Sequence, residues 1–131
     1  MSIAQNTATM DAVRRIREKI LKEFEKIQRK VDIGMDISIT TALIDDEVEQ
    51  LVLIALKEAK RPLSWREFKA IFAGIVGEDR LRRVLSGLKA KNQIAELTHT
   101  RYSLPEYVSP NEIDKVKNPG IISKILQKHT Q

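Results

Sequence analysis

The sequence predicts a mainly α-helical fold with one small β-hairpin, and three observations lead to it. Apolar residues recur every three or four positions over most of the 131 residues, as they do on one face of an amphipathic helix. Two short apolar segments, 94–97 and 102–104, break this period and are typical of paired strands. Hydrophobic residues make up 42% of the chain, which suffices for one hydrophobic core.

The N-terminal region is expected to form a long helix followed by a strand. Residues 1–9 are polar and unpatterned, so we expect a disordered tail there. From Asp11 to about Val31 the apolar residues follow a helical period. Apolar and polar residues then alternate over 31–40, which predicts a half-buried strand.

The apolar stripe of this N-terminal helix needs a surface to cover it. Its members are Val13, Ile16, Ile20, Phe24, Ile27 and Val31. The stripe either docks on the chain's own core or pairs with a second copy. A helix of about five turns offers more apolar surface than a small core easily covers. We therefore expect a homodimer that forms through this stripe.

The middle of the chain carries the clearest start signal for a helix. Ser64 and Glu67 form a capping box, and Leu63 and Phe68 occupy the positions of a hydrophobic staple around it. Gly74 suits the left-handed end of the same helix. We expect three helices and a hairpin in this region, at 45–60, 64–73, 79–91 and 94–104.

The C-terminal region is expected to add short helices. Ser109 and Glu112 form a second capping box around a proline, which predicts one or two helical turns through Val116. An amphipathic segment follows Gly120. The chain thus divides into a tail, an N-terminal helix-and-strand extension, a central domain and a C-terminal helical extension, at 1–9, 10–44, 45–107 and 108–131.

Composition and motifs exclude several classes of protein. The chain has no cysteine, so it has no disulfide, thiolate zinc site, iron–sulfur cluster or cysteine nucleophile. It lacks a glycine-rich phosphate loop, an HExxH motif and a serine elbow. We expect a non-enzyme with no catalytic residues, cofactor or metal. No signal peptide or long apolar segment is present, so we expect a cytoplasmic protein with no membrane partner.

The net charge of +5 hides a strong segregation of charge along the chain. Residues 80–101 hold six basic residues against Glu96 alone, whereas residues 32–58 hold seven acids against Lys57 alone. Such segregation predicts one surface that attracts a polyanion and another that does not. The acids at 45–47 also suit the positive end of a helix dipole, which explains them better than a cation site does.

The order of helix, extended link, helix, tight glycine-containing turn, helix and hairpin resembles the winged helix-turn-helix superfamily. The stretch from Arg80 to Leu104, RLRRVLSGLKAKNQIAELTHTRYSL, is similar to the recognition helix and wing of small prokaryotic DNA-binding regulators, archaeal ones included. The resemblance covers less than half of the chain and rests on pattern. It implies a dimeric, nucleoid-associated transcriptional regulator of double-stranded DNA. Helix 79–91 would read the major groove, and the wing 94–104 would also contact DNA.

Residue chemistry agrees with this expectation. If the apolar residues of helix 79–91 face inward, its outer side is basic and rich in hydrogen-bond donors, although such a face is often only a solvated surface. The N-terminal turn of helix 64–73 and the tip of the hairpin add further polar side chains. The candidate DNA-binding residues are Arg80, Arg82, Arg83, Ser86, Lys89, Arg66, Lys69, His99, Thr100 and Arg101.

The main alternative is a winged-helix protein-interaction module of transcription, replication or chromosome-partition machinery. It would bind a protein partner through the N-terminal helix or the acidic region 32–58. An RNA or single-strand binder is disfavoured because aromatic residues make up only 5% of the chain. Trp65 is expected to pack rather than stack on bases, and His99 and His129 are too isolated to be metal ligands or catalytic bases.

Overall fold

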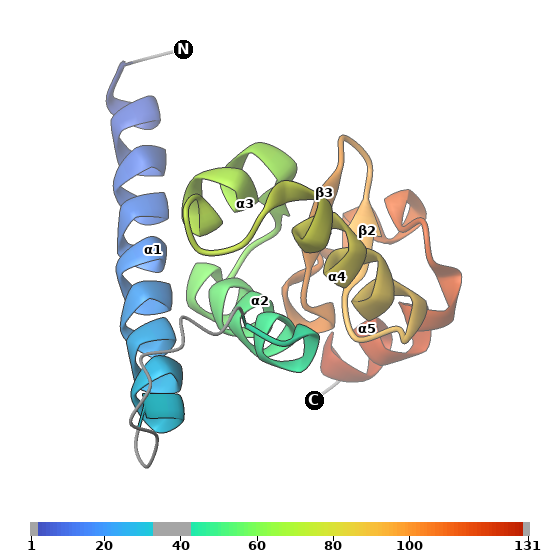
Figure 1. Cartoon of the computed structure of the whole chain (residues 1–131). Helices are drawn as coiled ribbons and strands as arrows, with labels where there is room; N and C mark the ends of the chain where they lie inside the picture. Colours follow the sequence, from blue (N-terminus) through green and yellow to red (C-terminus); the bar gives the residue numbers. More distant parts are fainter. Residues whose placement is uncertain (1–2, 33–42, 130–131) are drawn as a thin grey trace.

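The computed structural model describes residues 3–32 and 43–129 (Figure 1). These residues form a mainly helical fold with a small three-stranded antiparallel sheet, which confirms the predicted mainly α class with a β-hairpin. The helices are α1 (Ile3–Asp32), α2 (Asp45–Ala59), α3 (Trp65–Phe72), α4 (Glu78–Ala90) and α5 (Ile122–His129). The strands are β1 (Leu63–Ser64), β2 (Ala95–Leu97) and β3 (Arg101–Ser103). Three 3-10 helices lie near the C-terminus: η1 (Pro105–Tyr107), η2 (Pro110–Lys115) and η3 (Pro119–Ile121).

Helix α1 is longer than the sequence predicts. It begins at Ile3, so most of the segment 1–9 is helical and not the disordered tail that we expected. That segment contains no proline or glycine, and a helix that has formed extends at little further cost. The predicted strand at 31–40 falls largely on residues 33–42, which lie outside the described residues. Val31 belongs to the last turn of α1.

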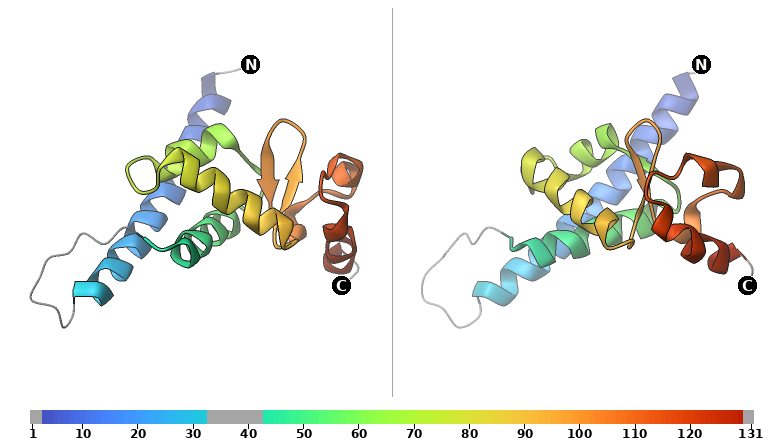
Figure 2. Two further views of the ribbon diagram at one scale, coloured as in Figure 1. Left: turned by 45° about the vertical axis from the view of Figure 1, so that its right-hand side comes forward. Right: turned by 90° about the vertical axis from the view of Figure 1, so that its right-hand side faces the viewer.

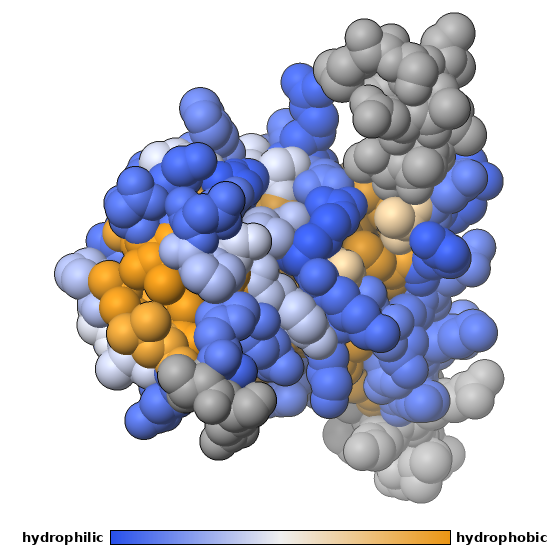
Figure 3. Space-filling model, turned by 180° about the vertical axis from the view of Figure 1, so that it is seen from behind, coloured by the Kyte–Doolittle hydropathy of each residue, from blue (hydrophilic) through white to orange (hydrophobic). Residues whose placement is uncertain are grey.

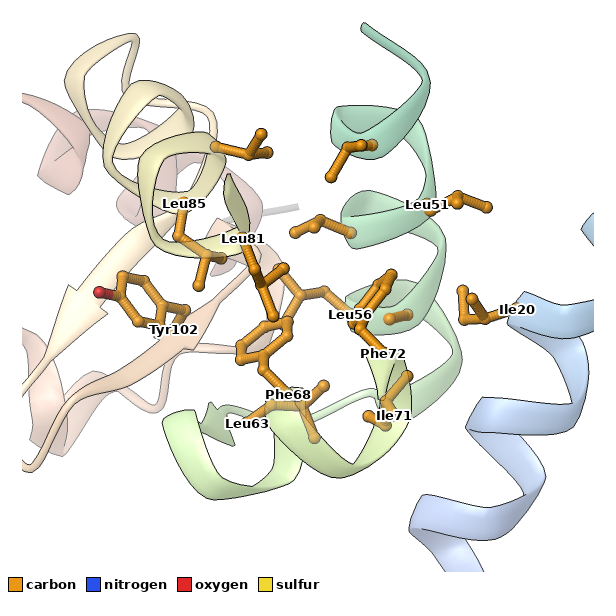
Figure 4. Packing of buried hydrophobic residues seen from close by; sticks show 14 of the residues in the cluster. Ile20, Leu51, Leu56, Leu63, Phe68, Ile71, Phe72, Leu81, Leu85 and Tyr102 are labelled. Carbon is orange, nitrogen blue, oxygen red and sulfur yellow. The ribbon is translucent and has the colours of Figure 1, made fainter. Parts of the chain in front are cut away.

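The apolar stripe of α1 packs on the chain's own core, whereas the sequence analysis favoured pairing with a second copy. Ile16 and Ile20 are 4% and 0% exposed, and Val13, Phe24 and Ile27 pack half-buried against the same cluster. Figure 4 shows Ile20 beside the core residues of α2 and α3. The core thus buries the middle of the stripe and partly covers Val13, Phe24 and Ile27. The side chain of Val31 lies outside the described part of the chain.

Arg17 fixes the position of α1 on α3. Its Nη1 atom donates to the carbonyl oxygens of Ile71 at 3.0 Å and Ala73 at 2.7 Å. The last carbonyls of a helix have no partners within the helix and lie at the negative end of its dipole. A guanidinium group there satisfies both needs, so Arg17 acts as a C-terminal cap supplied by another helix.

The capping box at the start of α3 is confirmed. The Ser64 hydroxyl accepts a hydrogen bond from the Glu67 amide at 3.2 Å, and the Glu67 carboxylate accepts one from the Ser64 amide at 2.9 Å. Leu63 and Phe68, the predicted staple, are fully buried. Gly74 has a φ of +78°, which glycine adopts without steric cost and which ends the helix as predicted.

The sheet has the order β1-β3-β2, with both pairs antiparallel. The hairpin β2–β3 was predicted, whereas the sequence indicated only an extended link where β1 forms. Tyr102 pairs with Leu63 on one side and Glu96 on the other. Its ring meets Phe68 edge-on at 6.0 Å, so the sheet closes one side of the main core (Figure 4).

The C-terminal elements build a second, smaller hydrophobic cluster against β2. Its buried members are Ala95, Leu97, Val108, Ile121 and Ile125. The side chain of Asn118 ties this region to the hairpin, because its Nδ2 donates to the Ile94 carbonyl at 2.9 Å and its Oδ1 accepts from the Glu96 amide at 3.0 Å. The hairpin therefore lies between two hydrophobic clusters.

The predicted capping box at Ser109 does not form. The Glu112 amide donates to the Ser109 carbonyl at 2.9 Å, which is the tight hydrogen bond of the 3-10 helix η2, and the Ser109 side chain makes no capping hydrogen bond. The carboxylate of Glu112 turns instead to Arg101, at 3.4 Å.

The elements are arranged side by side from the N-terminal to the C-terminal region. Helix α1 lies on one side, α2 and α3 pack against it, and α4 with the hairpin separates them from the C-terminal helices (Figures 1 and 2). Within the described ranges no helix is both long and apolar enough to cross a bilayer.

Candidate nucleic-acid interface

Helix α4 presents a polar outer face because its apolar side is fully used by the core. Leu81, Val84, Leu85 and Leu88 are buried, as the helical period predicts. On the opposite side Arg82, Arg83 and Ser86 are exposed. Figure 2 shows α4 beside the hairpin.

The acidic and basic segments of the sequence meet across α2 and α4. Asp45 pairs with the Nε of Arg80 at 2.9 Å and with the Nη2 of Arg83 at 3.3 Å. One turn along α2, Glu49 pairs with Lys91 at 2.9 Å. The hydrogen bond from Arg80 lowers the pKa of Asp45 below its usual value, and Arg83 adds to the effect. Acidic residues of α2 thus neutralise several basic residues of α4 within the domain.

Two further candidates are held by acids of the chain itself. Lys89 pairs with Glu96 at 2.8 Å, and both are half-buried. Arg101 donates through Nε to the Thr98 carbonyl at 3.0 Å and pairs with Glu112. These contacts stabilise the hairpin, so Lys89 and Arg101 do not join the exposed basic face that the sequence predicts.

Arg82 differs from the other basic residues of α4. Among the described residues it takes part in no ion pair, and its guanidinium carbon lies 4.6 Å from the centre of the Trp65 ring. A cation over the face of an indole is attracted to the ring and loses mobility. The same Trp65 packs against the core, as expected, and its amide donates to the Thr100 carbonyl at 2.9 Å.

Trp65 therefore joins three elements at one point. It begins α3, it lies under a side chain of α4, and it is hydrogen-bonded to the turn between β2 and β3. Sequence analysis missed its role as the support of Arg82. No local pattern relates residues 65 and 82, because their contact depends on the angle between two helices.

The hairpin turn places its polar residues outward. His99 and Thr100 are exposed, and both adopt left-handed backbone conformations, with φ of +64° and +51°. The carbonyl of Thr100 is bonded to Trp65, so the turn has a fixed position beside the start of α3. Thr100 and Arg82 thus both contact Trp65, one through its amide and the other over its ring.

The two candidates on α3 lie on different sides of that helix, because Lys69 is one turn from Trp65 and Arg66 is not. Arg66 and Lys69 are exposed, but Arg66 lines a pocket between α3 and α1. In the described part of the chain, no group of three or more histidine or acidic side chains comes close enough to hold a metal ion. The Nε2 of His129 lies 2.6 Å from the Val108 carbonyl, which gives this histidine a structural contact.

We group the exposed Arg82, Arg83 and Ser86 of α4 with the turn residues 99–100, which are tied to Trp65 through the Thr100 carbonyl, under the name α4 face. Arg80, Lys89 and Arg101 are bound to acids of the same chain, and so is Arg83 within the face. The face offers charged and hydroxyl donors to an anionic partner and contains no nucleophile–base pair for catalysis in its described residues. Comparisons with protein-family models, with curated proteins and with solved structures found no match for this chain.

Proposed function

We propose that this protein is a non-enzymatic, double-stranded DNA-binding protein with a winged helix-turn-helix domain, and that it regulates transcription. The observation that carries the proposal is the α4 face, where Arg82 stands over Trp65 without an acidic partner among the described residues. The order of α2, β1, α3, α4 and the β2–β3 hairpin agrees with this domain type. In this proposal α4 is the recognition helix and the hairpin is the wing.

The α4 face suits the major groove in its chemistry. Arg82 would present two parallel N–H donors to O6 and N7 of a guanine, which is the commonest specific contact of arginine with DNA. Support from the indole ring fixes the guanidinium before DNA arrives, so less side-chain entropy is lost on binding. Ser86 would donate to a base edge or a phosphate, and the turn residues would contact the backbone.

Gly87 adds a second line of support. It lies within α4 beside Ser86, and a Cβ at this position would meet no atom from beyond its own stretch of helix within 4 Å, in the described part of the chain. Glycine inside a helix costs about 1 kcal/mol relative to alanine. Packing within the chain does not require it, so we infer that a partner approaches the backbone here.

Arg83 would join the contact by exchanging partners. Its side chain is 65% exposed, and the Asp45 carboxylate that it pairs with is 52% exposed. Exposed ion pairs contribute little to stability because water and salt screen them. A phosphate can therefore replace Asp45 at Arg83 without unfolding any part of the domain.

Fluorescence anisotropy with a labelled DNA duplex tests the proposal. We expect affinity to fall steeply as salt rises, because bound phosphates release counterions. Arg82→Ala should weaken binding by about 1 to 3 kcal/mol on a preferred sequence if Arg82 contacts a base. Lys22→Ala is the matched control, since it removes one exposed positive charge from α1, which lies beyond α2 and α3 from α4. The proposal fails if the wild type shows no salt-dependent binding, or if both variants behave alike.

A protein-interaction module remains the second candidate, because the surface includes an apolar area. Figure 3 shows hydrophobic residues gathered on the side where the C-terminal elements lie. Leu126 of α5 is 49% exposed, and exposed apolar patches of this kind often mark protein contacts. This candidate predicts co-purification with a protein partner that survives high salt and is lost in Leu126→Glu, together with negligible affinity for DNA.

A further inference from the structure

A pocket of about 410 Å³ opens between α1 and α3, on the other side of α3 from the α4 face. Its lining is mostly apolar, and Arg14, Arg17 and Arg66 stand among the lining residues beside Met10, Val13, Glu67 and Ala70. Its volume falls within the range of roughly 300–1,000 Å³ that is typical of small-molecule sites. Neither the main core nor the α4 face makes use of this pocket.

The pocket is formed before any ligand arrives, because both of its walls are fixed. The buried Ile16 and Ile20 hold α1 on the core, and Arg17 binds the last carbonyls of α3. The opposite wall begins at the capping box of Ser64 and Glu67, which sets the start of α3. A ligand would therefore bind without the loss of entropy that ordering two helices requires.

The charge of the pocket is positive and has no free carboxylate to balance it. Glu67 is the one acid among its lining residues, and it is already paired with Arg61 at 2.7 Å. Arg66 forms no ion pair among the described residues. Arg14 has only a long contact of 3.9 Å with Asp11, and both side chains are largely exposed.

We propose that this pocket binds a small amphipathic carboxylate. The apolar chain or ring of the ligand would lie against Met10, Val13 and Ala70, and its carboxylate would face Arg66 and Arg14. Arginine suits this role because its planar fork binds both carboxylate oxygens. The site is separate from the α4 face, so the inference does not depend on DNA binding.

Two other occupants fit the pocket less well. A second copy of α1 would bring its own Arg14 and Arg17 and would place like charges together. A DNA backbone would satisfy the arginines but has no apolar group for Met10, which is 63% exposed. An anionic ligand with an apolar body matches both features.

Isothermal titration calorimetry on the full chain tests the inference with four probes. These are octanoate, octylammonium and octanol, which share one chain length, and inorganic phosphate, all below any micelle-forming concentration. We expect saturable one-to-one binding of octanoate, weaker binding of octanol, and none of octylammonium or phosphate. Equal binding of octylammonium and octanoate would show non-specific adsorption of alkyl chains, and binding of phosphate alone would show a simple anion site; either outcome overturns the proposal.

Variants then locate the site. Arg66→Gln should weaken octanoate binding about tenfold or more, which is the effect of losing a charged hydrogen bond. Ala70→Trp should abolish it by filling the pocket, and because Ala70 is exposed the fold is expected to tolerate this change. Lys22→Gln on the outer side of α1 is the control, with unchanged affinity expected. Unchanged affinity in both pocket variants, or a dimer in light scattering that Ala70→Trp dissociates, would contradict the proposal.

Discussion

Single residues of this chain perform more than one task, and Glu67 is the clearest case. Its carboxylate caps α3 through the Ser64 amide and at the same time accepts two hydrogen bonds from the guanidinium of Arg61, at 2.7 and 3.2 Å. Partial burial acts to raise the pKa of Glu67, but the hydrogen bonds from Arg61 and Ser64 outweigh it and hold the pKa below the usual 4.5. The start of α3 is therefore sensitive to acid.

We predict that Glu67→Gln lowers stability at neutral pH and that the difference from the wild type shrinks in acid. A depressed pKa in the folded state contributes stability above pH 4.5, and this contribution is lost as the pH falls through the folded-state value. The loss at pH 7 should be about 1 kcal/mol, which is typical of a broken cap. Urea unfolding over a pH series measures it.

Glu106→Gln is the control for this experiment, because Glu106 is exposed and lies outside the capping box. Its stability should stay close to that of the wild type at every pH. A Glu67→Gln deficit that is as large at about pH 3 as at pH 7 would show that the ionised carboxylate is not the cause.

At the scale of elements, the docking of α1 decides how the chain uses its apolar surface. The apolar stripe of α1, which we expected to pair with a second copy, packs on the core of the same chain. Arg17 adds hydrogen bonds to this contact at the end of α3. Helix α1 is thus part of the fold and not an appendage. Removing it would expose the buried side chains of α2 and α3.

We predict that Ile20→Ala destabilises the protein by about 2 to 5 kcal/mol, because it creates a cavity at a fully buried site. Lys22→Ala, two residues further along the same helix but exposed, should change stability by less than about 0.5 kcal/mol. Thermal unfolding at several protein concentrations measures both effects.

The concentration series separates internal docking from dimerisation. A contact within one chain gives a midpoint that does not depend on protein concentration, whereas a dimer interface gives a midpoint that rises with it. A rising midpoint that Ile20→Ala abolishes would restore the dimer interpretation of the stripe.

Sequence patterns predicted those elements whose signals are local. The capping box at Ser64, the glycine end of α3 and the inward stripe of α4 each involve residues within two turns of one another, and all three are present. The first residues of α1 were missed because they lack an apolar period, although nothing in them prevents a helix. The capping box at Ser109 does not form because the Glu112 amide donates to the Ser109 carbonyl in a 3-10 turn and not to the Ser109 hydroxyl.

The candidate site was predictable in part, for the same reason. The exposure of Arg82, Arg83 and Ser86 follows from the helical period alone. Lys89 and Arg101 carry the same charge and were grouped with them, but their acidic partners are reached only through the folded hairpin. The support of Arg82 by Trp65 and the α1–α3 pocket likewise arise from contacts between distant segments.

For the whole molecule, the distribution of charge matters more than its sum. Acids in the first turns of α2 pair with Arg80, Arg83 and Lys91 of α4 and its C-cap, so the domain partly neutralises its own basic residues. In the proposed function, Asp45 would compete with a phosphate for Arg80 and Arg83. The affinity for a polyanion would then depend on this internal competitor as well as on the arginines.

We predict that Asp45→Asn increases affinity for duplex DNA and makes its dependence on salt steeper, because the released arginines gain phosphate contacts. Glu58→Gln removes one exposed negative charge near the other end of α2, away from these arginines, and is the control. Anisotropy titrations at several salt concentrations compare the two. Equal gains in both variants would indicate a general effect of net charge and would contradict a specific competition at Asp45.

The place of the hairpin between two hydrophobic clusters has a consequence for the thermodynamics of binding. An isolated two-stranded hairpin is at best marginally stable in water. Here Tyr102 anchors one face in the main core, while Ala95 and Leu97 anchor the other among the C-terminal helices and Asn118 fastens the edge. The backbone entropy of the hairpin is thus lost when the chain folds and not when a partner binds. The C-terminal helices would by this means make the binding of a partner to the hairpin tighter.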